Sequence, residues 1–190
     1  MGELIRIGGI AGSLRKGSYN KATLQAARKL LPGGSVLDIL DLDGIPGFNE
    51  DQEEDFPPHA REFKNKVKAA DAILIVTPEY NYSVPGVLKN AIDWASRPHG
   101  DNAWKAKPVA VMGASPGMLG TARAQYHLRQ TFVYLDMFPL NQPEVMIANA
   151  TEKFDEQGNL KDAMTVERIK RLLEALIDWT KKLKQAAIIS

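Results

Sequence analysis

Residues 12–20, with the sequence GSLRKGSYN, decide the fold because of what lies on either side of them. They follow an apolar run, residues 4–10, and precede residues 21–31, in which Leu24, Ala27 and Leu31 recur at helical spacing. That order predicts a strand, a tight loop and a helix. Backbone N–H groups and the positive end of the helix dipole converge in such a loop, which favours a phosphate. Each charge-assisted hydrogen bond to the phosphate contributes roughly 1.5–3 kcal/mol.

The spacing of the glycines excludes two common nucleotide-binding loops. A dinucleotide-binding loop needs glycines at i, i+2 and i+5, which Gly8, Gly9 and Gly12 do not supply. A P-loop needs a lysine after its second glycine, but Ser18 follows Gly17 directly, so NTP hydrolysis is not expected. A single terminal phosphate fits the loop, and an ordinary helix-capping loop is the alternative that these residues leave open.

Length and charge exclude several classes of protein. The 190 residues suit one domain, which we expect to span 1–190. With 24 Lys and Arg against 23 Asp and Glu, no net field attracts nucleic acid or an anionic membrane. The absence of cysteine excludes disulfides, thiolate catalysis and iron–sulfur clusters, and the three histidines lack metal-ligand spacing, so no metal is expected. Without an apolar run of membrane-spanning length or a signal-peptide pattern, a cytoplasmic protein is expected.

Apolar runs alternate with helical patterns along the rest of the chain. Further strands are expected at 36–40, 72–77, 108–114 and 144–148, and helices at 59–69, 84–96 (with Ser83 as a possible N-cap), 121–134 and 160–184. Residues 41–58, acidic and without Lys or Arg, are expected to form a solvated connector. The alternation predicts an α/β, three-layer, flavodoxin-like fold with a five-stranded parallel sheet of order 2-1-3-4-5 and helices on both faces. Ligands bind beyond the carboxyl ends of such strands, so the loops after strands one, three and four should meet there.

The loop after the third expected strand is rich in aromatic residues and proline. Residues 78–86 read PEYNYSVPG, and residues 88–94 continue with LKNAIDW. A stiff aromatic loop can support a flat ring, whereas a helix-entry loop with core aromatics is the alternative. Together with GSLRKGSYN and with GASPG at 113–117 followed by Gly120, these motifs resemble the NADPH-dependent FMN reductases. That flavodoxin-like group includes quinone, azo-dye and chromate reductases, and the resemblance covers residues 4–150.

The resemblance implies an FMN site, NAD(P)H as co-substrate, and quinones, free flavin, azo compounds or chromate as acceptors. It implies no catalytic side chain, because hydride chemistry belongs to the flavin. Its implied residues are Ser13, Arg15, Ser18, Tyr19 and Asn20 for the phosphate, Pro78, Glu79, Tyr80 and Asn81 for the isoalloxazine, and Ser115 and Gly117 for a further wall. The Glu79 carboxylate is expected to face solvent or a neighbouring subunit. The loop 115–120 opens a helix, whose N–H groups and dipole are expected to stabilise negative charge near flavin N1.

The resemblance also implies a homodimer or a homotetramer. An unusually apolar region around the fourth helix suggests a partner surface in addition to packing on the sheet: Leu119, Leu128, Phe132, Leu135, Met137 and Phe138. Arg123 and Tyr126 face either the substrate mouth or that interface. Two rival functions remain, an electron-carrying flavodoxin and a phosphate-binding hydrolase without flavin. Flavodoxin carriers are usually strongly acidic, so a net charge of +1 disfavours the first.

Overall fold

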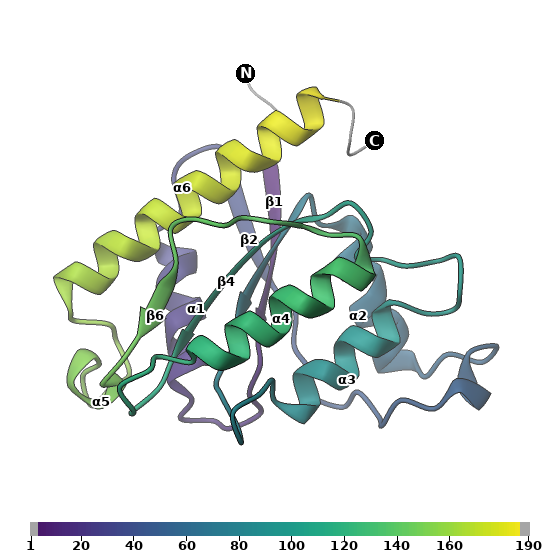
Figure 1. Cartoon of the computed structure of the whole chain (residues 1–190), viewed down its shortest axis with the longest axis horizontal. Helices are drawn as coiled ribbons and strands as arrows, with labels where there is room; N and C mark the ends of the chain where they lie inside the picture. The colour runs from purple at the N-terminus through teal and green to yellow at the C-terminus, as the bar shows by residue number, and fades with distance from the viewer. Residues whose placement is uncertain (1–3, 187–190) are drawn as a thin grey trace.

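A parallel sheet lies between two layers of helices in the computed structural model, which describes residues 4–186 (Figure 1). The strands are β1 (Ile5–Ala11), β2 (Ser35–Ile39), β3 (Ala72–Val76), β4 (Pro108–Ala114), β5 (Phe138–Pro139) and β6 (Val145–Ile147). The helices are α1 (Tyr19–Lys29), α2 (Pro58–Ala69), α3 (Gly86–Ala95), α4 (Ala122–Leu135), α5 (Ala150–Lys153) and α6 (Ala163–Gln185), with a 3₁₀ turn η1 (Glu50–Gln52). None of these helices is both long enough and apolar enough to span a membrane, a finding that covers residues 4–186 only.

The predicted strand order is confirmed, and the fifth position of the sheet holds two short strands. The order is β2-β1-β3-β4-β5, with every pairing parallel. The strand expected at 144–148 is β6, which pairs with the carboxyl-terminal half of β4, whereas the unexpected β5 pairs with its amino-terminal half. Pro139 and Pro143 lack the N–H that a continuous ladder requires, which explains the interruption between the two strands.

The two helical layers cover opposite faces of the sheet. Ile5 and Ile7 of β1 belong to the core that α1 and α6 cover, while Ile10 belongs to the core under α2, α3 and α4. Strands β3 and β4 are buried along their whole length, as a strand covered on both faces must be. Because β1, β3 and β4 run parallel, the loops at their carboxyl ends lie along one edge of the sheet.

Helix ends differ from the predicted bounds where a cap or a turn decides them. Helix α6 begins at Ala163 because the Asp162 carboxylate accepts a hydrogen bond from the Thr165 N–H at 2.8 Å. Helix α3 begins at Gly86, behind Pro85. The proposed Ser83 N-cap is wrong, since the Ser83 hydroxyl lies 2.9 Å from His127 Nδ1 on α4.

The acidic connector 41–58 is anchored on α3. The Phe48 N–H donates to Asn90 Oδ1 at 2.7 Å, and Asn90 Nδ2 and Trp94 Nε1 both donate to the Pro46 carbonyl at 2.8 Å. Most of its acidic side chains are exposed, as expected. The prediction of a solvated connector is thus confirmed for the acidic side chains. It is wrong for the segment as a whole, because its apolar side chains pack against α2 and α3.

Candidate functional site

The loop after β1 presents serine hydroxyls and free N–H groups at the start of α1. Ser18 caps the helix, because its Oγ accepts from the N–H groups of Asn20 at 3.2 Å and Lys21 at 3.4 Å. Ser13 Oγ accepts from the Arg15 N–H at 3.3 Å. Both serine side chains are buried, and each hydroxyl still has its own proton to donate.

A row of backbone donors in this loop has no acceptor. Across the part of the chain that the structure describes, the N–H groups of Leu14, Lys16, Gly17, Ser18 and Tyr19 make no hydrogen bond. The side chains of Arg15 and Lys16 are exposed beside them. Successive free N–H groups at a helix N-terminus, with cations alongside, form a concave site for an anion.

Asn20 and Tyr19 are held by the rest of the fold. Asn20 Nδ2 donates to the Ala114 carbonyl at 2.9 Å, and its Oδ1 accepts from the Ala114 N–H at 2.8 Å. The Tyr19 ring packs on Phe154, with 5.4 Å between ring centroids. The Asn20 side chain therefore fastens the first loop to the end of β4. Because both side chains are engaged elsewhere, Tyr19 and Asn20 contribute only backbone groups to the loop.

The loop after β3 contains a projecting tight turn. Tyr80 and Ser83 exchange backbone hydrogen bonds of 3.1 and 2.9 Å, around Asn81 and Tyr82 with φ of 51° and 66°. Two left-handed residues in succession define a turn of the kind that joins antiparallel strands. Tyr82 is 68% exposed. Within residues 4–186 the Glu79 and Asn81 N–H groups have no acceptor, so the turn offers two free donors.

The three loops meet at the carboxyl edge of the sheet, as predicted. A Cβ on Gly12 would lie 3.3 Å from Pro78 Cδ, so the first loop touches the second. A Cβ on Gly113 would lie 2.0 Å from Thr121 Oγ1 and 2.2 Å from the Thr77 carbonyl oxygen. Only glycine therefore allows the start of α4 to pack on the ends of β3 and β4.

The third loop keeps an open set of donors before α4. Ser115 Oγ accepts from the Gly117 N–H at 3.1 Å, and the Gly117 carbonyl accepts from the Asn149 N–H at 3.2 Å. Among the described residues, no acceptor faces the N–H groups of Met118, Leu119 and Gly120. This loop can therefore donate to a ligand through its backbone.

The prediction for the Glu79 carboxylate is wrong, because that group caps α4. Its side chain is only 8% exposed. Glu79 Oε2 accepts from the N–H groups of Arg123 at 3.0 Å and Ala124 at 3.2 Å, and Oε1 binds the Arg123 guanidinium. The start of a helix leaves N–H groups unsatisfied, and Thr121 supplies no side-chain cap. The first turn of α4 is thus occupied by Glu79, and the donors available for a ligand are those of the preceding loop.

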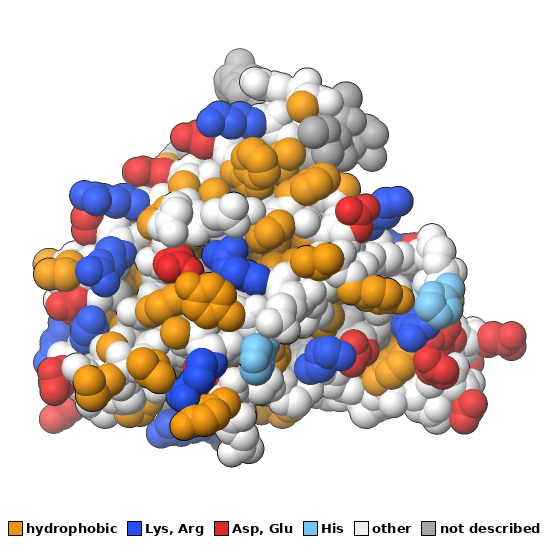
Figure 2. All heavy atoms as spheres, viewed as in Figure 1, with side chains coloured by type: hydrophobic (Ala, Val, Ile, Leu, Met, Phe, Trp, Pro, Cys, Tyr) orange, Lys and Arg blue, Asp and Glu red, His pale blue; other side chains and the backbone are white. Residues whose placement is uncertain are grey.

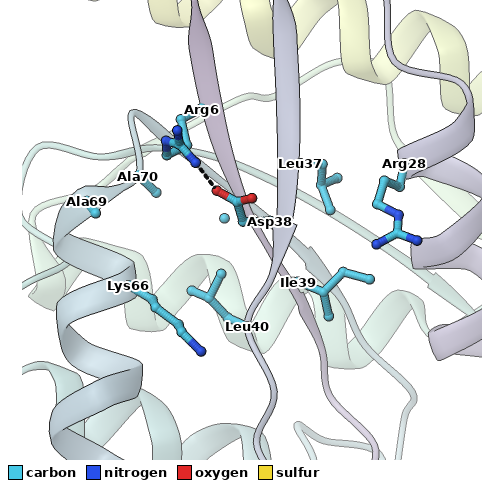
Figure 3. A pocket seen from close by; sticks show the side chains of 10 residues that line it. Arg6, Arg28, Leu37, Asp38, Ile39, Leu40, Lys66, Ala69 and Ala70 are labelled. Atoms are coloured by element: carbon cyan, nitrogen blue, oxygen red, sulfur yellow. Dashed lines mark hydrogen bonds and ion pairs between the residues drawn. The ribbon is translucent and has the colours of Figure 1, made fainter.

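Two hollows lie near these elements, and only one involves predicted site residues. The first, of about 760 Å³, is lined by residues 16–19, the outer side of α1 and the loop 155–159. The second, of about 470 Å³, lies at the β2 edge between Arg28 of α1 and Lys66 of α2, with the Arg6–Asp38 ion pair at its rim (Figure 3). Across the described chain, no three His, Asp or Glu side chains are placed to hold a metal ion.

Exposed apolar side chains gather on and just before α4, and they are only partly those predicted: Leu119 is 52% exposed and Tyr126 is 51% exposed. Leu128, Phe132, Leu135 and Met137 are buried in the core, so their interpretation as a partner surface is wrong. The exposed apolar residues on the outer side of α4, here called the α4 patch, are Tyr126, Val133 and Tyr134 (51%, 82% and 77% exposed). Hydrophobic atoms reach the surface on this face of the molecule (Figure 2). Val133 and Tyr134 lie seven and eight positions after Tyr126, but the buried Leu128 and Leu135 are also seven apart, so the spacing alone does not distinguish the exposed stripe.

The fold and the loops define a flavodoxin-like α/β protein with unpaired backbone donors at the carboxyl edge of its sheet. The NADPH-dependent FMN reductase family matches residues 5–152. An NAD(P)H-dependent FMN reductase of Pseudomonas aeruginosa is 54% identical over 185 residues, covering 97% of this chain and 100% of the relative. A 2-hydroxy-1,4-benzoquinone reductase of a Burkholderia species is 43% identical over 177 residues, covering 93% and 97%.

A solved structure agrees with these sequence relatives. FerB, a flavoenzyme NAD(P)H:(acceptor) oxidoreductase from Paracoccus denitrificans, superposes with a TM-score of 0.87 at 36% identity, covering 94% of this chain and 98% of FerB. The chain belongs to the NADPH-dependent FMN reductase family. The predictions of an enzyme, of FMN as cofactor and of NAD(P)H as co-substrate are confirmed at the level of the family.

Proposed function

We propose that this chain, as one FMN-binding domain over residues 1–190, is an NAD(P)H:quinone oxidoreductase. The observation that carries the proposal is the row of free N–H groups between Leu14 and Tyr19, at the N-terminus of α1. These donors, the hydroxyls of Ser13 and Ser18 and the exposed Arg15 fit a terminal phosphate dianion. Asn20 acts through its bonds to Ala114, which fix the loop in place.

The flavin ring would lie between the second and third loops. We assign ring contacts to the Pro78–Asn81 stretch, whose free donors are the N–H groups of Glu79 and Asn81. Ser115 and Gly117 form the opposite wall. FMN supplies the redox chemistry when bound, taking a hydride from the nicotinamide and passing electrons to the acceptor. The protein's part is to hold and orient the flavin and to leave one face open, so no catalytic side chain is assigned.

Quinones are the acceptors that we propose first, because relatives at 40–45% identity include enzymes with quinone reductase names. Free flavin, azo compounds and chromate are further acceptors within the proposal, since an open flavin face accepts many flat or small oxidants. A cytoplasmic location, where NAD(P)H is supplied, belongs to the same proposal. So does a homodimer or homotetramer in which the α4 patch contacts a second copy.

Rapid-mixing kinetics test this function. Protein loaded with FMN is mixed without oxygen against NADPH and then NADH, and flavin bleaching is followed. The reduced protein is next mixed with benzoquinone, free FMN, an azo dye and chromate. Bleaching by a nicotinamide and rapid reoxidation by the quinone are expected. A flavin that is reduced by neither nicotinamide would instead favour an electron carrier of the flavodoxin kind.

A further inference from the structure

The side chains of Glu79 and Arg123 join the second and third loops across 44 residues of sequence. The Glu79 carboxylate makes two bonds to the first turn of α4 and pairs with the guanidinium of Arg123. That guanidinium also lies over the Tyr82 ring, with 3.5 Å from Cζ to the ring centroid. The projecting turn is thus held at both ends, at Glu79 through its carboxylate and at Tyr82 through its ring.

The junction behind this pair is held by buried hydrogen bonds. Thr121 is buried with φ of 70°, and Gln125 Nε2 donates to Thr121 Oγ1 at 3.1 Å and to the Val145 carbonyl at 3.2 Å. These contacts tie the start of α4 to β6 and to the end of β4. Because these contacts anchor the start of α4 on the sheet, a group that binds its first turn takes its position from the sheet.

The pair also balances charge at the site. Desolvation disfavours the charged form of Arg123, but hydrogen bonds to Glu79 and Tyr82 outweigh it and leave the pKa of Arg123 above its ordinary value. The Glu79 carboxylate sits at the positive end of the α4 dipole, where two N–H groups of the first turn donate to it. The Glu79 carboxylate and the Arg123 guanidinium therefore lie side by side as an ion pair next to the Pro78–Asn81 stretch.

We propose that Glu79 and Arg123 act as a charge-balanced positioning pair for the flavin site. The pair fixes the free N–H groups of Glu79 and Asn81 against the donors of the third loop, and it keeps the local field near neutral. This inference rests on the proposed function, because it concerns the ring end of the same site. Glu79 is a positioning residue in this account: its side chain acts through the backbone donors and the local charge.

Charge balance makes a prediction that a purely structural role does not. Reduction adds negative charge to a flavin, so a nearby carboxylate opposes it and a nearby guanidinium favours it. Glu79→Gln leaves Arg123 uncompensated and should move the midpoint potential of bound FMN to more positive values. Arg123→Gln leaves the carboxylate uncompensated and should move it to more negative values. The double variant Glu79→Gln/Arg123→Gln should return close to the wild-type potential.

The experiment measures the potential and the visible circular dichroism of bound FMN in these three variants and in wild type. Asp162→Asn is the matched control. Like Glu79, Asp162 is a carboxylate that caps a helix, but it caps α6 and lies outside the three loops, so the variant removes one negative charge away from the site. It should leave both readouts unchanged. Glu79→Ala, which also removes the hydrogen-bond acceptors, should weaken FMN binding about tenfold, with dichroism closer to that of free FMN.

Opposite shifts for the two single variants, with recovery in the double variant, support the pair. Shifts of the same sign, or no shift in either, overturn it. If Glu79→Gln does not fold, Arg123→Gln alone still tests the proposal, because the proposal requires this variant to move the midpoint potential of bound FMN to more negative values. Wild-type protein that binds no FMN overturns the proposed function and this inference together, whereas wild type that binds FMN while the variants match it overturns the inference alone.

Discussion

Single side chains at this site act over long sequence distances. Asn20 reaches Ala114, 94 residues away, and makes with both amide atoms the two hydrogen bonds that a neighbouring strand would make. The Glu79 carboxylate accepts hydrogen bonds from two N–H groups in the first turn of α4, of which that of Arg123 is 44 residues away. Residue types and local spacing carry no information about such partners. The sequence therefore predicted which loops meet at the carboxyl edge of the sheet, while the partners of Asn20 and Glu79 required the structure.

Arg15→Ala tests the phosphate assignment at the residue scale. The Arg15 side chain is exposed and has no ion-pair partner among residues 4–186, so its removal should leave the melting temperature of the FMN-free protein unchanged. Loss of a charge-assisted bond, worth roughly 1.5–3 kcal/mol, should weaken FMN binding by about ten- to a hundredfold in calorimetry. Arg28→Ala, an exposed arginine of α1 outside the loop, is the control. Equal weakening by both variants would contradict the assignment.

Asn20→Ala tests the fastening of the first loop. The variant leaves the Ala114 N–H and carbonyl without partners in a buried setting, which should lower the free energy of unfolding by about 1–3 kcal/mol. Denaturant unfolding of the FMN-free protein measures the loss. Stability equal to that of wild type would show that the Asn20 amide contributes nothing to the fold.

At the scale of elements, burial decides what the sequence can reveal. Strands β1, β3 and β4 appear as apolar runs because both of their faces are covered. Strand β5 has two residues, too few for any periodic pattern. The ends of α3 and α6 depend on a turn and on a cap, which propensity places only to within a few residues.

Asp162→Ala tests the cap of α6. The Thr165 hydroxyl and N–H hold the pKa of Asp162 below its ordinary value of 3.8. A lowered pKa in the folded state contributes stability above the unfolded pKa and loses it as pH falls through the folded value. At pH 7 the variant should be about 1 kcal/mol less stable than wild type, and the difference should shrink below about pH 4. A difference that stays constant from pH 7 to pH 2 would contradict this account.

At the scale of the whole molecule, the α4 patch is an apolar surface that no part of the described chain covers. Tyr126, Val133 and Tyr134 lie on the outer side of a helix whose inner side is fully packed, as burial against a second copy requires. Fold class and strand order followed from the alternation of elements. The patch required the structure, because buried and exposed apolar residues on α4 differ only in their phase along the helix.

Light scattering tests the homo-oligomer. Wild type should have two or four times the mass of one chain, and Val133→Glu/Tyr134→Glu should reduce it, because buried carboxylates without partners oppose association. Met164→Glu, at an exposed apolar residue of α6, should not. Wild type with the mass of a single chain would contradict the proposed interface.

The central claim is that the loop between Leu14 and Tyr19 binds the phosphate of a flavin. Calorimetric titration of the flavin-free protein with FMN and with riboflavin tests it most directly, because the two ligands differ only in that phosphate. The account predicts that FMN binds at least about a hundredfold more tightly, as two charge-assisted bonds require. Equal affinity for the two ligands, or no binding of FMN, would contradict it.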